Sequence, residues 1–246
     1  MDRLVYTAMT GAKQVMEKQT TVAQNLANTN TIGFRGQIDT FRAVPVPGAG
    51  LPTRVQVMDE TLSADYSVGK VSQTGRNLDV AIEGAGWISV LTADGREAYT
   101  RAGDLKIAPN GALQIHSGQS VLSEEGPIIV NNDTSLMIGK DGALSYLVAG
   151  DNPVTTNFLG RMKLVNPSIN ALKRGDDGLF YAVDGGSFNA DPNVTIQSGA
   201  LEESNVNVVE TMVDMISLGR QFDMQMELLK NAESNAAKSS QVMSLT

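Results

Sequence analysis

Cysteine is absent from the 246-residue sequence, and histidine and tryptophan occur once each. Without cysteine the chain can form no disulfide, no thiolate nucleophile and no cysteine-bound metal site. A Ser-His-Asp triad or a histidine-based metal site would have to use His116, which stands between a short apolar stretch and a Ser-Gly turn signal. We interpret His116 as the end of a strand, and we predict no catalytic, cofactor-binding or metal-binding residue.

Aromatic residues, basic runs and long apolar stretches are also scarce. Aromatics make up 5% of the chain, and the formal net charge is -8. Phosphate backbones and anionic membranes repel an acidic chain that has no basic run, so we expect neither as a partner. No apolar run reaches the roughly 18 residues that cross a bilayer. The first ten residues lack an apolar signal core, so we expect no cleaved signal peptide.

Two short motifs could suggest ligand chemistry, and we interpret both as turns. Asp176-Asp177-Gly178 offers paired carboxylates, but neighbouring strand residues point to opposite faces and the glycine favours a turn. Gly84-Ala85-Gly86 lacks the third glycine and the following helix of a phosphate-binding loop. Trp87 follows it, and we expect this side chain to be a core or interface anchor.

The clearest periodic pattern lies near the N-terminus. Apolar residues recur there in alternating steps of three and four, which is typical of an amphipathic helix with a heptad seam. The seam comprises Val5, Ala8, Ala12, Val15, Gln19, Val22 and Leu26. We predict one helix over residues 2–28, ending between Asn28 and Gly33 because asparagine and glycine tolerate a left-handed conformation.

A second seam lies near the C-terminus. It comprises Val208, Met212, Met215, Gly219, Phe222, Met226 and Leu229. Asn207 followed by Glu210 resembles a capping box, so we predict a helix over residues 208–243. Glycine destabilises a helix interior by about 1 kcal/mol. We therefore interpret Gly219 as a position of close helix approach.

Neither predicted helix can bury its seam by itself. A helix of about 27 residues is about 40 Å long, whereas a domain of about 125 residues has a radius of gyration of about 14 Å. We predict that the two terminal helices pair as a coiled coil and then pack against other subunits, with the two seams as the assembly interface. The alternative is that both helices pack only on the β-domain of their own chain.

The sequence between the two helices lacks their helical periodicity. Residues 31–75 contain several prolines and little helical periodicity, so we predict an extended arm. Residues 76–204 alternate short apolar segments with turn signals, which predicts a β-rich outer domain. The turn pairs are Asp94-Gly95, Asn110-Gly111 and Asp141-Gly142. The predicted fold is therefore mixed α and β, with a discontinuous helical domain of residues 1–30 and 205–246 beside a central all-β domain.

Three segments resemble the flagellar axial proteins, which are the rod, hook and hook-associated proteins. The first is Asn25-Leu26-Ala27-Asn28, followed after four residues by Gly33-Phe34-Arg35. The second runs from Leu201 through Ser204-Asn205-Val206 into the last helix. The third comprises Gly84-Ala85-Gly86-Trp87, Tyr99-Thr100-Arg101-Ala102-Gly103 and Asn110-Gly111-Ala112-Leu113. Because all three follow the family order over nearly the whole chain, the chain is identified as a member of the flagellar basal-body rod family.

Details of the resemblance favour a proximal-rod member. The opening Met1–Gly11 and the stretch Phe41–Val46 look like those of proximal-rod proteins. Gln24 and Trp87 depart from the usual asparagine and phenylalanine, and they bear only on which rod member this is. A distal-rod or hook-type axial protein remains the alternative. An extracellular β-domain hydrolase is less favoured, because the sequence shows no close carboxylate pair.

The resemblance implies a structural subunit without cofactor or enzymatic activity. Such a subunit polymerises through its terminal helices into a torque-transmitting shaft, in which the helices line the export channel and the β-domain lies outside. The implied partners are proximal and distal rod subunits, the flagellar export apparatus and the MS ring. The implied location is the basal body, spanning the periplasm, reached by type III export without signal cleavage.

Overall fold

The chain forms two compact units. The computed structural model describes residues 2–45, 55–130, 134–148 and 157–243. The first unit comprises Met1–Asn28, Gln37–Asp65 and Val206–Thr246, and the second comprises Thr29–Gly36 and Tyr66–Asn205. Met1 and Val46, which belong to the two segments that favour a proximal-rod member, lie outside the described residues.

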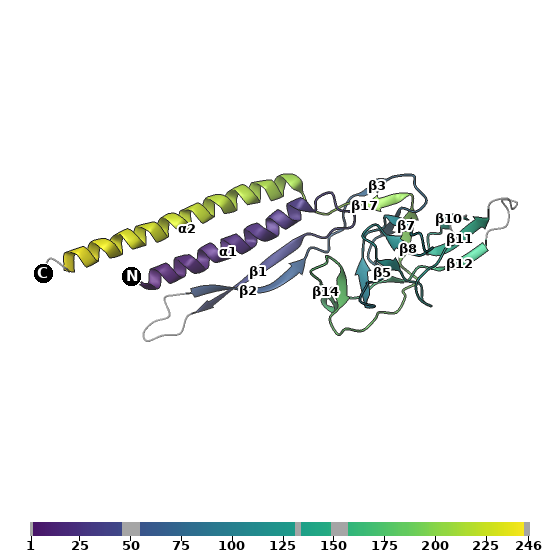
Figure 1. Ribbon diagram of the computed structural model, residues 1–246, viewed down its shortest axis with the longest axis horizontal. Helices are drawn as coiled ribbons and strands as arrows, with labels where there is room; N and C mark the ends of the chain where they lie inside the picture. The colour runs from purple at the N-terminus through teal and green to yellow at the C-terminus, as the bar shows by residue number, and fades with distance from the viewer. Residues whose placement is uncertain (1, 46–54, 131–133, 149–156, 244–246) are drawn as a thin grey trace. The chain divides into compact units, whose positions relative to one another are not determined.

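Two long helices dominate the first unit. Helix α1 spans Asp2–Ala27 and helix α2 spans Val208–Met243, which confirms the predicted helices and, with the strands below, the mixed α and β fold class. The two helices contact each other and run in opposite directions (Figure 1). Within the described part of the chain, neither helix combines the length and apolar content that a bilayer crossing requires.

The helix ends follow the predicted capping chemistry. Asn207 Oδ1 accepts hydrogen bonds from the backbone N–H groups of Val209 at 3.0 Å and Glu210 at 3.5 Å, so Asn207 caps the first turn of α2. After α1, the chain turns through residues 28–33. Gly33 adopts a φ of 66°, the left-handed conformation that was expected at this point.

A β-hairpin completes the first unit. Strand β1 (Gln37–Pro45) pairs antiparallel with strand β2 (Val55–Ala64), and the register shifts between Thr40 and Phe41. Both strands contact α1, and Thr21 Oγ1 donates to Asp39 Oδ1 at 2.9 Å. The structure thus groups most of the predicted arm with the two helices, because an isolated two-stranded hairpin needs a packing partner.

The second unit is built from short strands around one larger sheet. Its elements are β3 (Val71–Gln73), β4 (Val80–Glu83), β5 (Trp87–Leu91), β6 (Glu97–Thr100), β7 (Leu105–Ile107), β8 (Leu113–Ile115), β9 (Ser120–Val121), β10 (Thr134–Ile138), β11 (Ala143–Val148), β12 (Asn157–Arg161), β13 (Leu164–Val165), η1 (Ile169–Ala171), β14 (Leu172–Arg174), β15 (Phe180–Ala182), β16 (Thr195–Ser198) and β17 (Ala200–Glu202). The larger sheet has the order β14-β15-β6-β5-β9-β8-β7, with β13 paired to β5. A three-stranded sheet β10-β11-β12 and the pairs β16-β4 and β17-β3 complete the unit.

Glycine turns connect these strands as the sequence predicts. Gly95, Gly111 and Gly142 adopt φ values of 76°, 81° and 79° in the links β5–β6, β7–β8 and β10–β11. The turn around Gly84 and Gly86 likewise precedes β5. Between the turns, alternate strand residues face inward and form one apolar core. Its fully buried members include Val80, Ile82, Ile88, Val90, Leu105, Leu113, Ile115, Leu144 and Ile196.

Candidate assembly interface

The predicted seam of α1 faces the inside of the first unit. Its residues are buried or half-buried: Val5, Ala8, Ala12, Val15, Gln19, Val22 and Leu26. A neighbouring stripe on the same helix remains in solvent and includes Tyr6, Met9 and Met16. Helix α1 therefore carries two apolar surfaces, of which the chain itself covers only one.

The inward stripe of α2 is displaced from the predicted seam. The residues that are buried or half-buried follow a regular four-three pattern: Thr211, Met215, Leu218, Phe222, Gln225, Leu229 and Ala232. Of the predicted residues, Met215, Phe222 and Leu229 lie on this stripe and Gly219 is half-buried beside it. Val208, Met212 and Met226 are exposed. The single chain thus leaves part of the predicted assembly seam uncovered.

More apolar side chains extend the uncovered surface of α2. Val213, Ile216 and Met224 are 60%, 59% and 57% exposed and line a shallow recess of 350 Å³ together with Arg220. We name the uncovered apolar residues of α2 the outer stripe: Val208, Val209, Met212, Val213, Ile216, Met224, Met226 and Leu228. Large contiguous apolar patches on a protein surface mark interaction sites, so this stripe is the candidate contact surface of α2.

A mainly apolar groove lies where three elements of the first unit meet. It has a volume of 390 Å³ and is lined by Thr7, Ala8, Thr10 and Gly11 of α1, Val55 and Val57 of β2, and Gln225 and Leu228 of α2. The small side chains on α1 create this space. A Cβ atom added at Gly219 of α2 would meet no atom within 4 Å, so this glycine also leaves open space in the single chain.

The two family-motif asparagines at the end of α1 are fixed by polar contacts. Asn25 Nδ2 donates to the carbonyl of Gln37 at 2.9 Å, and Asn25 Oδ1 accepts from the Gln37 N–H at 2.8 Å. Leu26 is half-buried, Ala27 is exposed, and Asn28 Nδ2 donates to the carbonyl of Gln24 at 2.9 Å. Asn25 therefore joins the last turn of α1 to the start of β1, and Asn28 bonds back to that last turn.

In the second unit, Phe34 and Arg35 lie in the interior. Arg174 places its guanidinium 4.6 Å from the centre of the Phe34 ring and donates a hydrogen bond to the carbonyl of Arg35. Burial lowers the pKa of Arg174, although Asp177 and Tyr66 oppose this effect. The Arg35 side chain is fully buried and forms an ion pair with Glu202 at 2.6 Å.

The second half of the family motif lies close to the first. Asn205 Oδ1 accepts from the Gly36 N–H at 2.8 Å, and the Asn205 N–H donates to the carbonyl of Phe34 at 3.3 Å. Ser204 and Val206, its neighbours, are half-buried. Sequence reasoning placed these residues in family motifs, but it missed their contacts and the role of Glu202, because those contacts join residues far apart in the chain.

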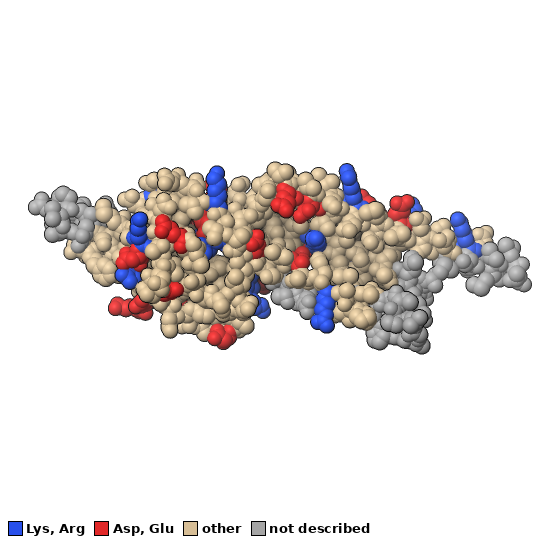
Figure 2. Space-filling model, turned by 180° about the vertical axis from the view of Figure 1, so that it is seen from behind, with Lys and Arg blue, Asp and Glu red and all other residues tan. Residues whose placement is uncertain are grey.

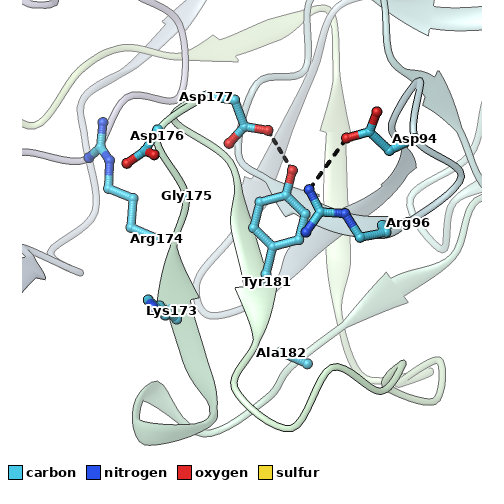
Figure 3. Close-up of a pocket in the computed structure, with 9 residues that line it drawn as sticks. All are labelled: Asp94, Arg96, Lys173, Arg174, Gly175, Asp176, Asp177, Tyr181 and Ala182. Atoms are coloured by element: carbon cyan, nitrogen blue, oxygen red, sulfur yellow. Dashed lines mark hydrogen bonds and ion pairs between the residues drawn. The ribbon is translucent and has the colours of Figure 1, made fainter.

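A recess with many charged groups lies at the hairpins β5–β6 and β14–β15 (Figure 3). Its volume is 510 Å³, and its lining includes Asp94, Arg96, Asp177 and Tyr181. Arg96 stands 4.9 Å from the centre of the Tyr181 ring, and the Tyr181 hydroxyl donates to Asp177 at 2.5 Å. Burial, reinforced by Asp177, raises the pKa of Tyr181 to about 12, so its hydroxyl stays protonated at neutral pH. Arg96, Tyr181 and Asp177 therefore contact one another within the lining of this recess.

The predicted turns and anchors occupy the positions expected of structural residues. Asp177 Oδ1 accepts from the Leu179 N–H at 3.1 Å, which confirms the turn at this site. The Trp87 side chain is buried, and the centre of its ring lies 4.5 Å from the centre of the Phe180 ring. This position confirms the interpretation of Trp87 as a core anchor. His116 is exposed just after β8. Among the described residues, no group of three His, Asp or Glu side chains could hold a metal ion.

Acidic and basic side chains are interspersed on the surface. On the described atoms of the face in Figure 2, neither sign forms a broad patch, and uncharged side chains cover larger areas between them. Surface ion pairs such as Lys13–Glu17, at 3.4 Å, contribute little to stability because water screens them. The uncovered apolar residues of α1 and α2 are therefore the candidate assembly surface of this chain.

Comparisons with known proteins agree with the family resemblance. A family model described as flagellar basal body rod FlgEFG protein C-terminal matches residues 197–242. A second, described as flagellar hook protein FlgE/F/G D1 domain, matches residues 81–146. The flagellar basal-body rod protein FlgF of Escherichia coli K12 is 44% identical over 252 residues, covering 100% of both chains. The chain belongs to the flagellar basal-body rod protein family.

Other rod-family relatives show which branch the chain resembles. FlgF of Salmonella typhimurium is 43% identical over 252 residues, again covering 100% of both chains. FlgG of Buchnera aphidicola from Acyrthosiphon pisum is 30% identical over 244 residues, covering 90% of this chain and 92% of its own. Among these relatives, the likeness to the FlgF proteins is both stronger and fuller.

Proposed function

We propose that this chain is a structural subunit of the flagellar basal-body rod, of the FlgF type, and that it works by assembly and not by catalysis. The observation that carries this proposal is the uncovered apolar surface of α1 and α2 in a chain whose full length matches FlgF proteins. A soluble monomer has no use for such a surface, whereas a polymer buries it.

Polymerisation takes place through the two terminal helices. Within one chain, α1 and α2 act as a coiled-coil pair, which the regular four-three spacing of both inward stripes supports. Between chains, the outer stripe of α2 and the exposed Tyr6, Met9 and Met16 of α1 supply the contacts. Burial of one large apolar side chain stabilises a contact by about 1.5–3 kcal/mol, so a few such residues hold neighbours firmly.

The neighbours are other rod subunits, proximal and distal, with the export apparatus and the MS ring at the base. In this arrangement the paired helices form the inner tube around the export channel and the β-rich unit lies outside. Torque passes through many interlocked helices.

The basal body location, across the periplasm, requires passage through the flagellar export apparatus. We propose that the chain travels without cleavage of its first residues. Val5, Ala8 and Ala12 form the start of the inward stripe, so removal of a leader of about 20 residues would delete most of α1. Retention of these residues in assembled rods, read by mass spectrometry of isolated basal bodies, tests this point.

A gene deletion scored by electron microscopy of basal bodies tests the proposed function. We expect cells without this protein to be non-motile and to hold basal bodies that stop before the distal rod. Reintroduction of a chain lacking about 25 residues at either end should not restore motility, although its β-rich unit stays folded. Normal swimming in the deletion strain, or in the truncated strains, would refute the assembly model. Arrest after completion of the rod would favour the distal-rod or hook alternative.

A further inference from the structure

Three segments that resemble family motifs meet at one buried carboxylate. Glu202, at the end of β17, pairs with Arg35 through Oε1 at 2.6 Å and with Arg101 through Oε2 at 3.0 Å. The three side chains are 0%, 0% and 4% exposed. Two guanidinium groups thus share one carboxylate in the interior of the second unit.

The backbone around Glu202 is fixed as well. The Gly33 N–H donates to the Glu202 carbonyl at 2.7 Å, and the Gly69 N–H donates to Oε1 at 2.9 Å. Both positions require glycine because another segment of backbone lies too close for a side chain. An added Cβ would lie 2.3 Å from the Ala102 nitrogen at Gly33 and 2.0 Å from the Glu203 carbonyl oxygen at Gly69. Segments from four parts of the chain therefore meet here.

Asn205 adds a second point of attachment nearby. Besides its bonds with Gly36 and Phe34, its Nδ2 group donates to the carbonyl and the hydroxyl of Ser67, each at 3.1 Å. The chain passes between the two compact units after residues 36, 65 and 205, among other places. Asn205 itself stands at one of these passages and bonds directly to residues that lie within two positions of the other two.

The two residues differ in what their loss would do. Removing the Glu202 charge leaves two buried guanidinium groups without their partner, which strongly destabilises the surrounding structure. Burial already lowers the pKa of Arg101, although Glu202 opposes this, and the nearby Arg35 lowers it further. Asn205 is only half-buried and uncharged, so its hydrogen bonds can be removed while the core of the unit stays intact.

We propose that Glu202 and Asn205 form a latch, in which Glu202 anchors the segments inside the β-rich unit and Asn205 holds together the chain near three of its passages between the units. In an assembled rod, this latch is the route by which load passes between the β-rich unit and the terminal helices. The load path rests on the proposed function, whereas the latch itself concerns the isolated chain.

Hydrogen exchange of the purified full-length chain tests the latch itself. We expect Asn205→Ala to speed exchange of the Gly36 amide roughly tenfold, since a lost hydrogen bond of about 1.4 kcal/mol corresponds to that factor. Exchange at Leu113 in the core should change less than about twofold. Asn205→Asp keeps the acceptor for Gly36 but loses the donor to Ser67, so Gly36 should remain protected.

A matched control separates this effect from the general loss of an asparagine. Asn193 is exposed, lies in the same unit, and donates through Nδ2 to Asp191 at 2.8 Å. Asn193→Ala should leave exchange at Gly36 unchanged. Unchanged exchange at Gly36 in Asn205→Ala, or equal acceleration in Asn205→Ala and Asn193→Ala, would overturn the latch.

Swimming under load tests the mechanical role. Cells that carry Asn205→Ala in place of the native chain should swim almost normally in dilute medium and lose most of their motility in viscous medium. Asn193→Ala cells should match the native chain in both. An equal response of both variants to viscosity would overturn the load path, even where the exchange data support the latch. Failure of the gene deletion to affect rods would instead refute the proposed function.

Discussion

The two compact units differ in how far they bury their large apolar side chains. The β-rich unit has a continuous core in which Val90, Leu105 and Leu113 are fully buried by residues of the same chain. The helical unit buries mostly small side chains, such as Ala8, Ala12 and Ala232, while larger ones remain in solvent. Its outer stripe on α2 has no counterpart of similar length among the described residues of the β-rich unit.

This difference shows which unit is complete as a single chain. A unit that buries its large apolar side chains gains most of its stability from its own fold. A unit that exposes them reaches its full stability only in contact with other molecules. Substitutions in the first should therefore alter the free energy of unfolding of the isolated chain, and substitutions in the second should alter assembly.

The largest change in stability is expected from the core of the β-rich unit. Leu113→Ala removes a side chain that is 0% exposed, and we expect it to lower the free energy of unfolding by about 2–5 kcal/mol. Denaturant titration of the purified chain measures this value. The same truncation at Ile216, which is 59% exposed, serves as the control and should change it by less than about 0.5 kcal/mol. Similar effects at the two sites would remove the contrast between the units.

A smaller change is expected at the start of α2. Asn207→Ala removes the acceptor for the N–H groups of Val209 and Glu210, and we expect it to weaken the first turn by about 1 kcal/mol. Asn207→Ser keeps an acceptor and should retain most of the stability. Circular dichroism during urea unfolding distinguishes the variants, and equal curves for all three would show that this cap is dispensable.

Gly219 is expected to affect assembly and not the folding of the single chain. A side chain at this position meets open space, so Gly219→Leu should stabilise helix α2 by roughly 0.5–1 kcal/mol. The same change should block close approach of a neighbour and abolish motility. Asp214→Leu, at an exposed position of α2 that lines neither the groove nor the recess, is the control for a new apolar side chain. Swimming Gly219→Leu cells would rule out close packing at this glycine.

The smallest change concerns the pH dependence of the β-rich unit. Burial, reinforced by Asp79, raises the pKa of Asp104 above its usual value. Its ionised form is therefore disfavoured in the fold, and stability is lost as the pH rises above the ordinary Asp pKa of about 3.9. Asp104→Asn should raise the melting temperature at pH 7 by at most a few degrees. The gain should vanish near pH 3, and a gain that persists there would point to another cause.

The sequence predicts the helices well because their periodicity is local. The seam from Val5 to Leu26 faces inward as expected, and the turns at Gly95, Gly111 and Gly142 follow from their glycines. On α2, apolar residues occur on more than one side, so periodicity could not decide which stripe the chain itself covers. The inward stripe includes Thr211 and Gln225, which are polar and therefore cannot be found by a search for apolar periodicity.

The ion pairs of Glu202 with Arg35 and Arg101 could not be predicted from local sequence patterns. Arg101 and Glu202 are 101 residues apart, and the bond between Gly36 and Asn205 joins residues 169 apart. The family motifs point to the importance of these segments, but only the folded chain brings them together. The position of β1 and β2 beside α1 is a similar case, because prolines in this segment suggested an arm and the pairing of the strands is set by the packing.

The pairing of early with late strands has a consequence for the order in which the chain can fold during synthesis. Strand β4 pairs with β16 and β3 pairs with β17, so the first strands of the body have no partner until residues 195–202 have been made. Closing such long loops slows folding. The β3–β17 and β4–β16 pairs of a nascent chain therefore cannot form until Glu202 has been made, although strands such as β5 and β6 can pair earlier.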